Sequence, residues 1–210
     1  MYRIICYGDS NTFGFVPGGD PFRYPEDIVW TGVLKSLLGD EYDVINCGMC
    51  GRTTAFDREG AEDQNGLKTI EETLRDNAPC DMIIIMLGTN DTDYHLALSP
   101  KEIAYGMEKL VIKAGAVSEK LGLSPRIAVV CPPAIKEGIT NSSFSFMANI
   151  SSRERSLNLS GYYEKLAEKH GAAFVDCTDL DGVSDKDSMH LTPEGHRLLA
   201  EKIRDELFRA

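Results

Sequence analysis

The feature that most constrains the fold is a regular alternation between short apolar runs and longer segments with helical spacing. The short runs are rich in β-branched residues and occupy residues 3–7, 42–47, 81–87, 126–131 and 173–176. Between them, apolar residues recur every three or four positions. This alternation is typical of βαβ units, in which a helix carries the chain from one strand to the next parallel strand. We therefore predict an α/β fold with five parallel strands.

Two of the predicted helices have clear start signals. Before the fourth strand, Ser99 is a predicted N-cap, Pro100 takes the first helical position, and Glu102 completes a capping box. Near the C-terminus, Thr192 is a predicted N-cap and Pro193 follows it. Apolar spacing predicts two further helices, at residues 29–38 and 67–74.

Length and composition are those of an ordinary globular protein. The chain has 210 residues, of which 42% are hydrophobic and 26% charged. Because no linker or repeat interrupts the pattern, we predict one domain spanning residues 1–210. The longest apolar run, residues 82–87, is far shorter than the roughly 20 residues that a membrane helix needs. The N-terminus has no secretory cleavage signal, so we expect a cytoplasmic protein.

Charge and cysteine usage exclude several kinds of partner. The formal net charge of -11 repels nucleic acids and anionic membrane surfaces, so we expect neither as a partner. The six cysteines lie mostly beside apolar runs, and we expect no disulfides. Cys47 and Cys50 have a spacing found in metal and redox sites, but no second pair of cysteines or histidines matches them. We therefore expect no metal.

A possible nucleophile follows the first predicted strand. Gly8, Asp9 and Ser10 form a turn at the carboxyl end of that strand, where ligand sites of open α/β sheets gather. A serine hydroxyl is a weak nucleophile unless a base accepts its proton. After the fifth strand, Asp187 and His190 stand three residues apart. One loop could therefore supply both the base and a carboxylate that orients it.

Two further strand ends carry groups that could stabilise a negative oxygen. Gly51 lies on the loop after the second strand, and Asn90 follows the third. The backbone N–H groups of Ser10 and Gly51 and the side-chain amide of Asn90 could converge on a tetrahedral intermediate, as acyl transfer requires. Each of these residues alone is also compatible with an ordinary turn.

In this order, on successive strand ends, these motifs resemble the four sequence blocks of the SGNH, or GDSL, hydrolase family. The blocks are Gly8-Asp9-Ser10, Gly51, Gly88-Thr89-Asn90-Asp91 and Asp187-Ser188-Met189-His190. The resemblance spans nearly the whole chain. It implies that Ser10 is the nucleophile, His190 the base and Asp187 its orienting partner. It also implies an oxyanion hole made by Ser10, Gly51 and Asn90.

Further segments look like the bacterial arylesterase/acyltransferase branch of that family. They are residues 8–12, 30–34, 51–54 and 86–92. This resemblance implies a flavodoxin-like, three-layer α/β/α sandwich, no cofactor, and frequently a homo-oligomer. It also implies a serine esterase that hydrolyses short-chain aryl or alkyl esters through an acyl-enzyme. The acyl acceptor would be water or an alcohol.

Two irregular stretches after strand ends, residues 11–27 and 132–151, are candidate pocket walls. We expect Phe13, Phe15, Phe144 and Phe146 to bind substrate, although the same side chains could pack on the core or on another subunit. Asp93 departs from the family pattern, and we expect its charge at the pocket mouth. Two alternatives stay open: a carbohydrate O-deacetylase with the same catalytic residues, and a ligand-binding module without activity.

Overall fold

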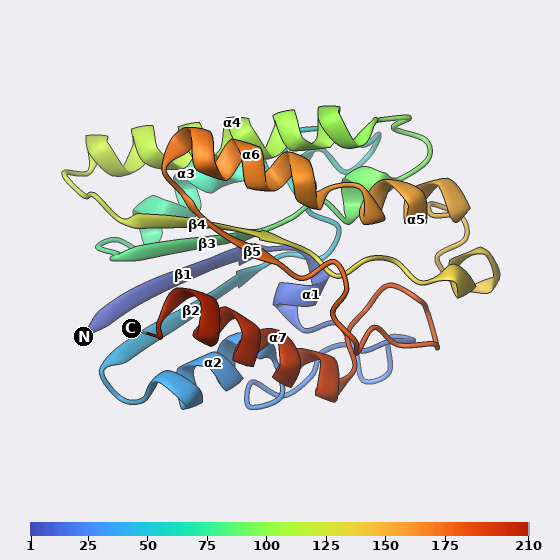
Figure 1. The fold of residues 1–210 in the computed structure, drawn as a ribbon, viewed down its shortest axis with the longest axis horizontal. Coiled ribbons are helices and arrows are strands. Elements are labelled where there is room, and N and C mark those ends of the chain that lie inside the picture. Colours follow the sequence, from blue (N-terminus) through green and yellow to red (C-terminus); the bar gives the residue numbers. More distant parts are fainter. Residues whose placement is uncertain (210) are drawn as a thin grey trace.

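The structure is a computed structural model that describes residues 1–209. Within these residues, one parallel five-stranded sheet forms the centre of the molecule (Figure 1). The strands are β1 (Tyr2–Gly8), β2 (Tyr42–Gly48), β3 (Met82–Met86), β4 (Arg126–Cys131) and β5 (Ala173–Asp176). Their order is β2-β1-β3-β4-β5, and every neighbouring pair is parallel. This is the flavodoxin-like order, so the predicted α/β fold is confirmed.

Helices cover both faces of the sheet and complete three layers (Figure 1). One face is covered by α3 (Gly66–Asp76), α4 (Pro100–Lys120) and α6 (Ser160–His170), and the other by α2 (Trp30–Leu38) and α7 (Pro193–Leu207). Because successive strand residues point to opposite faces, each strand serves two cores. In β1, Ile5 and Tyr7 belong to the first core, and Ile4 and Cys6 to the second.

The predicted helix starts are confirmed. The Ser99 hydroxyl accepts a hydrogen bond from the backbone N–H of Glu102 at 3.3 Å, and the Glu102 carboxylate accepts one from the Ser99 N–H at 2.8 Å. The Thr192 hydroxyl accepts from the backbone N–H of Gly195 at 3.1 Å. These caps satisfy N–H groups that the first helical turn leaves without partners.

The two stretches that the sequence indicates as irregular contain short helices. The first includes most of α1 (Ser10–Phe13), and the second includes the 3-10 helix η3 (Glu137–Asn141) and the start of α5 (Ile150–Leu157). Asn149 caps α5, because its side-chain oxygen accepts from the backbone N–H groups of residues 151 and 152. The cap, rather than an apolar stripe, fixes where this helix begins.

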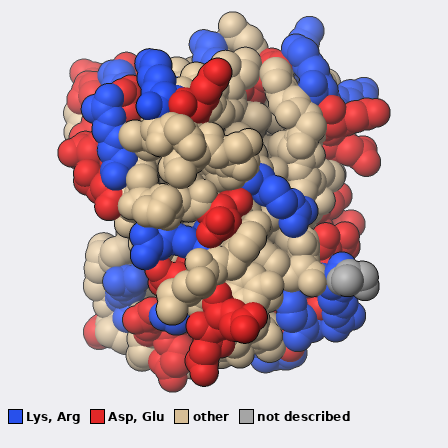
Figure 2. Space-filling model, turned by 90° about the vertical axis from the view of Figure 1, so that its left-hand side faces the viewer, with Lys and Arg blue, Asp and Glu red and all other residues tan. Residues whose placement is uncertain are grey.

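All five strands run toward the side of the molecule where α1 and α5 lie, whereas the N-terminus and the end of α7 lie at the opposite side (Figure 1). The loops that follow β1, β2, β3 and β5 therefore meet at one edge of the sheet. On the opposite side, acidic and basic side chains are interspersed (Figure 2). No helix among residues 1–209 has both the length and the apolar character needed to cross a membrane.

Candidate active site

Three side chains from the two ends of the chain form a hydrogen-bonded row at the carboxyl edge of the sheet. His190 Nε2 lies 2.9 Å from Ser10 Oγ, and His190 Nδ1 lies 2.8 Å from Asp187 Oδ2. The exposed fractions are 6% for Ser10, 2% for His190 and 0% for Asp187. When Nδ1 carries the proton of the neutral imidazole, Nε2 is free to accept the Ser10 proton.

The end of β1 holds Ser10 at the start of α1. Asp9 caps that helix, since its Oδ1 accepts from the backbone N–H of Asn11 at 3.0 Å. Gly8 is needed where the chain turns, because a Cβ there would collide with the Thr12 side chain and with the Met86 carbonyl oxygen. Ser10 therefore lies at the first position of α1, shortly after the end of β1.

A tight turn holds Asp187 and His190 together. Ser188 has a positive φ of 63°, which a residue other than glycine seldom adopts. The turn lets Asp187 Oδ1 accept from the backbone N–H groups of Met189 at 3.1 Å and His190 at 3.0 Å. Asp187 Oδ2 remains for the imidazole. Burial raises the pKa of the Asp187 carboxyl, but the hydrogen bonds and charge of His190 outweigh it and lower the pKa overall.

Asn11 ties this turn to the serine. Its Nδ2 donates to the Met189 carbonyl oxygen at 3.3 Å, and its Oδ1 accepts from the Leu191 N–H at 3.0 Å. Both contacts flank His190 in sequence. The amide therefore fixes the histidine loop against the residue that follows Ser10.

Gly51 and Asn90 lie beside Ser10, as the sequence predicts. Gly51 adopts φ 79°, which turns the loop after β2 toward the serine. Within residues 1–209, no hydrogen bond is found for the backbone N–H of Ser10 or of Gly51. The Asn90 amide donates to the Arg52 carbonyl oxygen at 3.1 Å, and Asp9 Oδ2 lies 3.5 Å from the same nitrogen. Ser10, Gly51 and Asn90 thus line one small hollow.

Two further sets of hydrogen bonds, made by Thr54 and by Arg52, hold the loop after β2. The backbone N–H and the hydroxyl of Thr54 both donate to the Asp91 carboxylate, at 3.0 and 2.5 Å. The Arg52 guanidinium donates to the carbonyl oxygens of Gly8 and Cys47, at 2.8 and 2.5 Å. Burial raises the pKa of Asp91 to about 6, although hydrogen bonds from Thr54 oppose the rise. These contacts lock three strand ends into one rigid edge.

A hollow of about 220 Å³, here called the Ser10 pocket, opens above these groups. It is lined by Ser10, Phe15, Cys50, Gly51, Arg58, Gln64, Asn90, Phe144, Phe146, Met147, Met189 and His190. The rings of Phe15 and Phe144 lie 4.5 and 5.0 Å from the His190 ring, centre to centre. Of the predicted substrate-binding residues, Phe15, Phe144 and Phe146 are therefore brought together with the serine.

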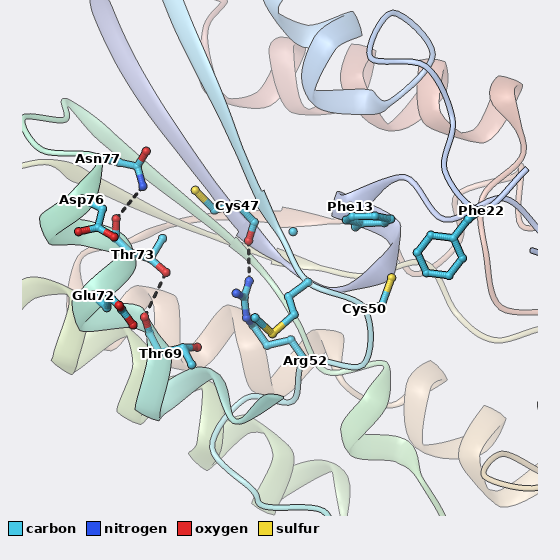
Figure 3. Close-up of a pocket in the computed structure, with 12 residues that line it drawn as sticks. Phe13, Phe22, Cys47, Cys50, Arg52, Thr69, Glu72, Thr73, Asp76 and Asn77 are labelled. Atoms are coloured by element: carbon cyan, nitrogen blue, oxygen red, sulfur yellow. Dashed lines mark hydrogen bonds between the residues drawn. The ribbon is translucent and has the colours of Figure 1, made fainter. Parts of the chain in front are cut away.

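The other two predicted substrate-binding residues line neighbouring hollows. Phe13 lies with Phe22 on one side of a hollow of about 530 Å³, here called the Phe13 hollow, opposite residues of α3 (Figure 3). Asp93 lies in a hollow of about 500 Å³, here called the Asp93 hollow, with Arg58 and Phe146. Neither residue is part of the Ser10 pocket. The sequence predicts an irregular stretch at Phe13, but this residue ends helix α1, and Asp93 follows the 3-10 helix Asn90–Thr92. The sequence could not show which hollow either side chain lines.

Comparison with known proteins agrees with this geometry. The model of the GDSL-like lipase/acylhydrolase family matches residues 6–198. The chain belongs to this family.

Solved structures of two ester hydrolases resemble the chain over almost its full length. A carbohydrate acetylesterase from Sinorhizobium meliloti is 33% identical with a TM-score of 0.91, covering 99% of this chain and 98% of that one. The native aryl esterase of M. smegmatis is 32% identical with a TM-score of 0.88, covering 99% of this chain and 100% of that one. The protein is thus an SGNH-type serine ester hydrolase.

A curated relative is more distant. A Bacillus subtilis protein that bears the name of an uncharacterized lipoprotein is 24% identical over 226 residues, covering 96% of this chain and 88% of its own. The cytoplasmic location expected from the sequence stays a prediction.

Sequence motifs did not indicate several residues that line the hydrolase's pocket. Arg58 and Gln64 come from the segment between the loop after β2 and α3, where no motif marks them. Met189 lies within the fourth sequence block, but the family resemblance assigns it no role. Cys50 also lines the pocket, and burial raises the pKa of its thiol to about 11, so it is uncharged at neutral pH. Within residues 1–209 no group of three His, Cys, Asp or Glu side chains is arranged to hold a metal ion.

Proposed function

We propose that the protein hydrolyses short-chain acyl esters through an acyl-enzyme on Ser10. The observation that carries this proposal is the position of His190, whose two ring nitrogens lie within 3 Å of Ser10 Oγ and Asp187 Oδ2. A histidine held in this way can take a proton from the serine while the carboxylate stabilises the imidazolium that forms.

The reaction has two halves. Ser10 Oγ attacks the ester carbonyl carbon while His190 Nε2 takes the hydroxyl proton, and a tetrahedral intermediate forms. His190 then returns the proton to the leaving alcohol oxygen, which departs and leaves the acyl group on Ser10. A water molecule attacks this acyl-enzyme, again giving its proton to His190. The acid leaves as the proton returns to Ser10 Oγ.

The oxyanion of each intermediate would be bound by the backbone N–H groups of Ser10 and Gly51 and by the Asn90 amide. The two backbone donors have no other hydrogen bond within residues 1–209, so they are available for a substrate oxygen. No proton transfer or charge in this scheme requires a metal or a cofactor. Dialysis against a chelator is therefore expected to leave activity unchanged.

The Ser10 pocket favours a small acyl group. Its volume is about 220 Å³, and buried Met147 and Met189 together with Phe144 close it. Ester series of increasing chain length on one alcohol should show the highest kcat/KM for the shortest acyl groups. Because an alcohol can replace water in the second half-reaction, addition of an alcohol should also divert part of the acyl group to a new ester.

The test of the assignment is the Ser10→Ala variant, with Ser36→Ala as a control on the exposed face of α2. We expect Ser10→Ala to lose ester turnover and labelling by a fluorophosphonate, with an unchanged melting temperature, because its hydroxyl supplies the covalent step and little packing. Ser36→Ala should keep both properties. Wild-type activity in Ser10→Ala, or a label attached elsewhere, would exclude Ser10 as the nucleophile.

A further inference from the structure

We infer that the Asp93 hollow binds the alcohol portion of the ester and selects a polyhydroxylated, sugar-like alcohol. This inference rests on the proposed function, because it assigns the part of the substrate that leaves Ser10. Arg58, Phe146 and Met147 line both the Asp93 hollow and the Ser10 pocket. A substrate larger than the Ser10 pocket can therefore extend past these three side chains.

The position of His190 sets the direction in which the alcohol extends. The leaving oxygen must lie within hydrogen-bond reach of His190 Nε2, which protonates it. The Phe144 ring lies 5.0 Å from the His190 ring and 6.1 Å from the Phe146 ring, centre to centre. This row of rings leads from the base to the Asp93 hollow.

The Phe13 hollow is a poorer choice for the alcohol. It meets the Ser10 pocket at Cys50, which is the neighbour of the oxyanion residue Gly51 and not of His190. Glu72 and Asp76 stand at its α3 side and Arg52 also lines it, while Phe13, Phe22 and Met49 supply apolar walls. An alcohol placed there would have its oxygen on the wrong side of the reacting carbon.

Asp93 gives the hollow a hydrogen-bond acceptor that the protein does not use. Its Oδ1 accepts from the backbone N–H and the ring Nδ1 of His95, both at 2.9 Å. Within residues 1–209, no donor is found for its Oδ2, although the side chain is only 9% exposed. A carboxylate oxygen that is nearly buried is stabilised when a ligand hydroxyl donates to it.

Arg58 adds hydrogen-bond donors to the Asp93 hollow, and Phe146 adds an apolar face. One terminal nitrogen of the Arg58 guanidinium, Nη2, donates to the Gly51 carbonyl oxygen at 2.5 Å and to Gln64 Oε1, whereas within residues 1–209 no hydrogen bond is found for the other, Nη1. The Phe146 side chain is exposed by 64% and presents an apolar face at the border of the two hollows. Donor, acceptor and apolar face together match an alcohol that carries several hydroxyl groups on a carbon ring. A simple aryl alcohol would cover the Asp93 carboxylate without bonding to it, which is unfavourable.

The experiment compares two acetyl esters that give the same acyl-enzyme. One is a monoacetylated glucose, and the other is phenyl acetate. Because deacylation is common to both, a difference between them arises in binding or in acylation. We expect Asp93→Ala to lower the ratio of kcat/KM for the sugar ester to that for phenyl acetate by tenfold or more, mainly through KM. Asp93→Asn keeps an acceptor oxygen and should lower the ratio by a smaller factor.

The matched controls are Asp76→Ala and Asp76→Asn, which remove the same groups from the Phe13 hollow. They should leave the ratio within twofold of the wild type. Melting temperatures and fluorophosphonate titration of Ser10 confirm that each variant is folded. If the Asp93 variants change both esters equally, or change neither, the alcohol does not bind in this hollow. If the wild-type protein hydrolyses neither ester, the proposed function itself fails.

Discussion

The Asn90 amide already has a role in the resting protein, since its Nδ2 donates to the Arg52 carbonyl oxygen at 3.1 Å. The second N–H of this amide has only a distant acceptor, Asp9 Oδ2 at 3.5 Å, so it is the one that can bind charge developing in the intermediate. Asn90→Ala should lower kcat by roughly 10² to 10³ with KM nearly unchanged, because one oxyanion donor typically contributes about 3 kcal/mol. Active-site-titrated kcat is the measurement that checks this.

The Arg52 contact requires a second measurement on the same variant. Loss of that hydrogen bond should also loosen the loop that carries Gly51, so the melting temperature should fall modestly. A variant with a lower melting temperature but normal kcat per titrated site would show that Asn90 only supports the loop. The oxyanion would then depend on backbone N–H groups alone.

At the scale of single residues, the sequence indicated which side chains could react together more clearly than it indicated which hollow a side chain would line. Ser10, Asp187 and His190 could be paired from the sequence because a serine needs a base and strand ends meet at one edge. Phe13 could not be assigned in the same way. Its neighbour Phe15, two residues along, packs on His190, whereas Phe13 faces the hollow on the other side of Cys50. Such a difference depends on backbone angles within α1 and the turn that follows it.

At the scale of elements, the contact between Thr54 and Asp91 joins the loop after β2 to the 3-10 helix η2 (Asn90–Thr92) after β3. Burial raises the pKa of the Asp91 carboxyl from 3.8 to about 6. Between these two values the folded protein holds a proton that the unfolded chain has released. The free energy of unfolding therefore falls as pH rises from about 4 to about 6.

Asp91→Asn removes this titration, because an amide does not ionise. Relative to the wild type, the variant's free energy of unfolding should increase as pH rises from about 4 to 6 and stay level above pH 7. The increase should be roughly 3 kcal/mol at most, from the size of the pKa change. Denaturant unfolding of both proteins at several pH values provides the measurement. A difference independent of pH would mean that Asp91 ionises as it does in the unfolded chain.

The helices differ in how clearly their sequences predict them. The start of α4 was predictable because Ser99 and Glu102 form a capping box and an apolar stripe follows. By contrast, α5 has two large apolar residues, Ile150 and Leu157, and both are exposed. Its buried face is made by serines, and Ser156 Oγ accepts a hydrogen bond from the Ile135 N–H at 3.1 Å. A helix that packs through hydroxyl groups leaves no periodic apolar signal.

For the whole molecule, we predict a homo-oligomer whose interface covers part of residues 132–151 and leaves the Asp93 hollow open to substrate. Three large apolar residues lie close together on this stretch, but Met147 is buried and Phe144 packs with Ile135, Ile139 and Met189. Phe146 alone among the three is largely exposed, at 64%. Sedimentation at micromolar concentration should give a mass above the 23.2 kDa of one chain. Phe146→Ser should shift the population toward monomer, and a wild-type monomer would exclude the assembly.

The hydrogen bond between Ser10 and His190 joins residues that are 180 positions apart. The Asn11 contacts across the same gap close the two ends of the chain onto each other. During synthesis Ser10 leaves the ribosome 180 residues before His190 does. A chain that stops before His190 therefore lacks the imidazole that lies beside Ser10. Ester turnover by this protein therefore requires that translation has passed His190 and that the segments around Ser10 and His190 have folded together.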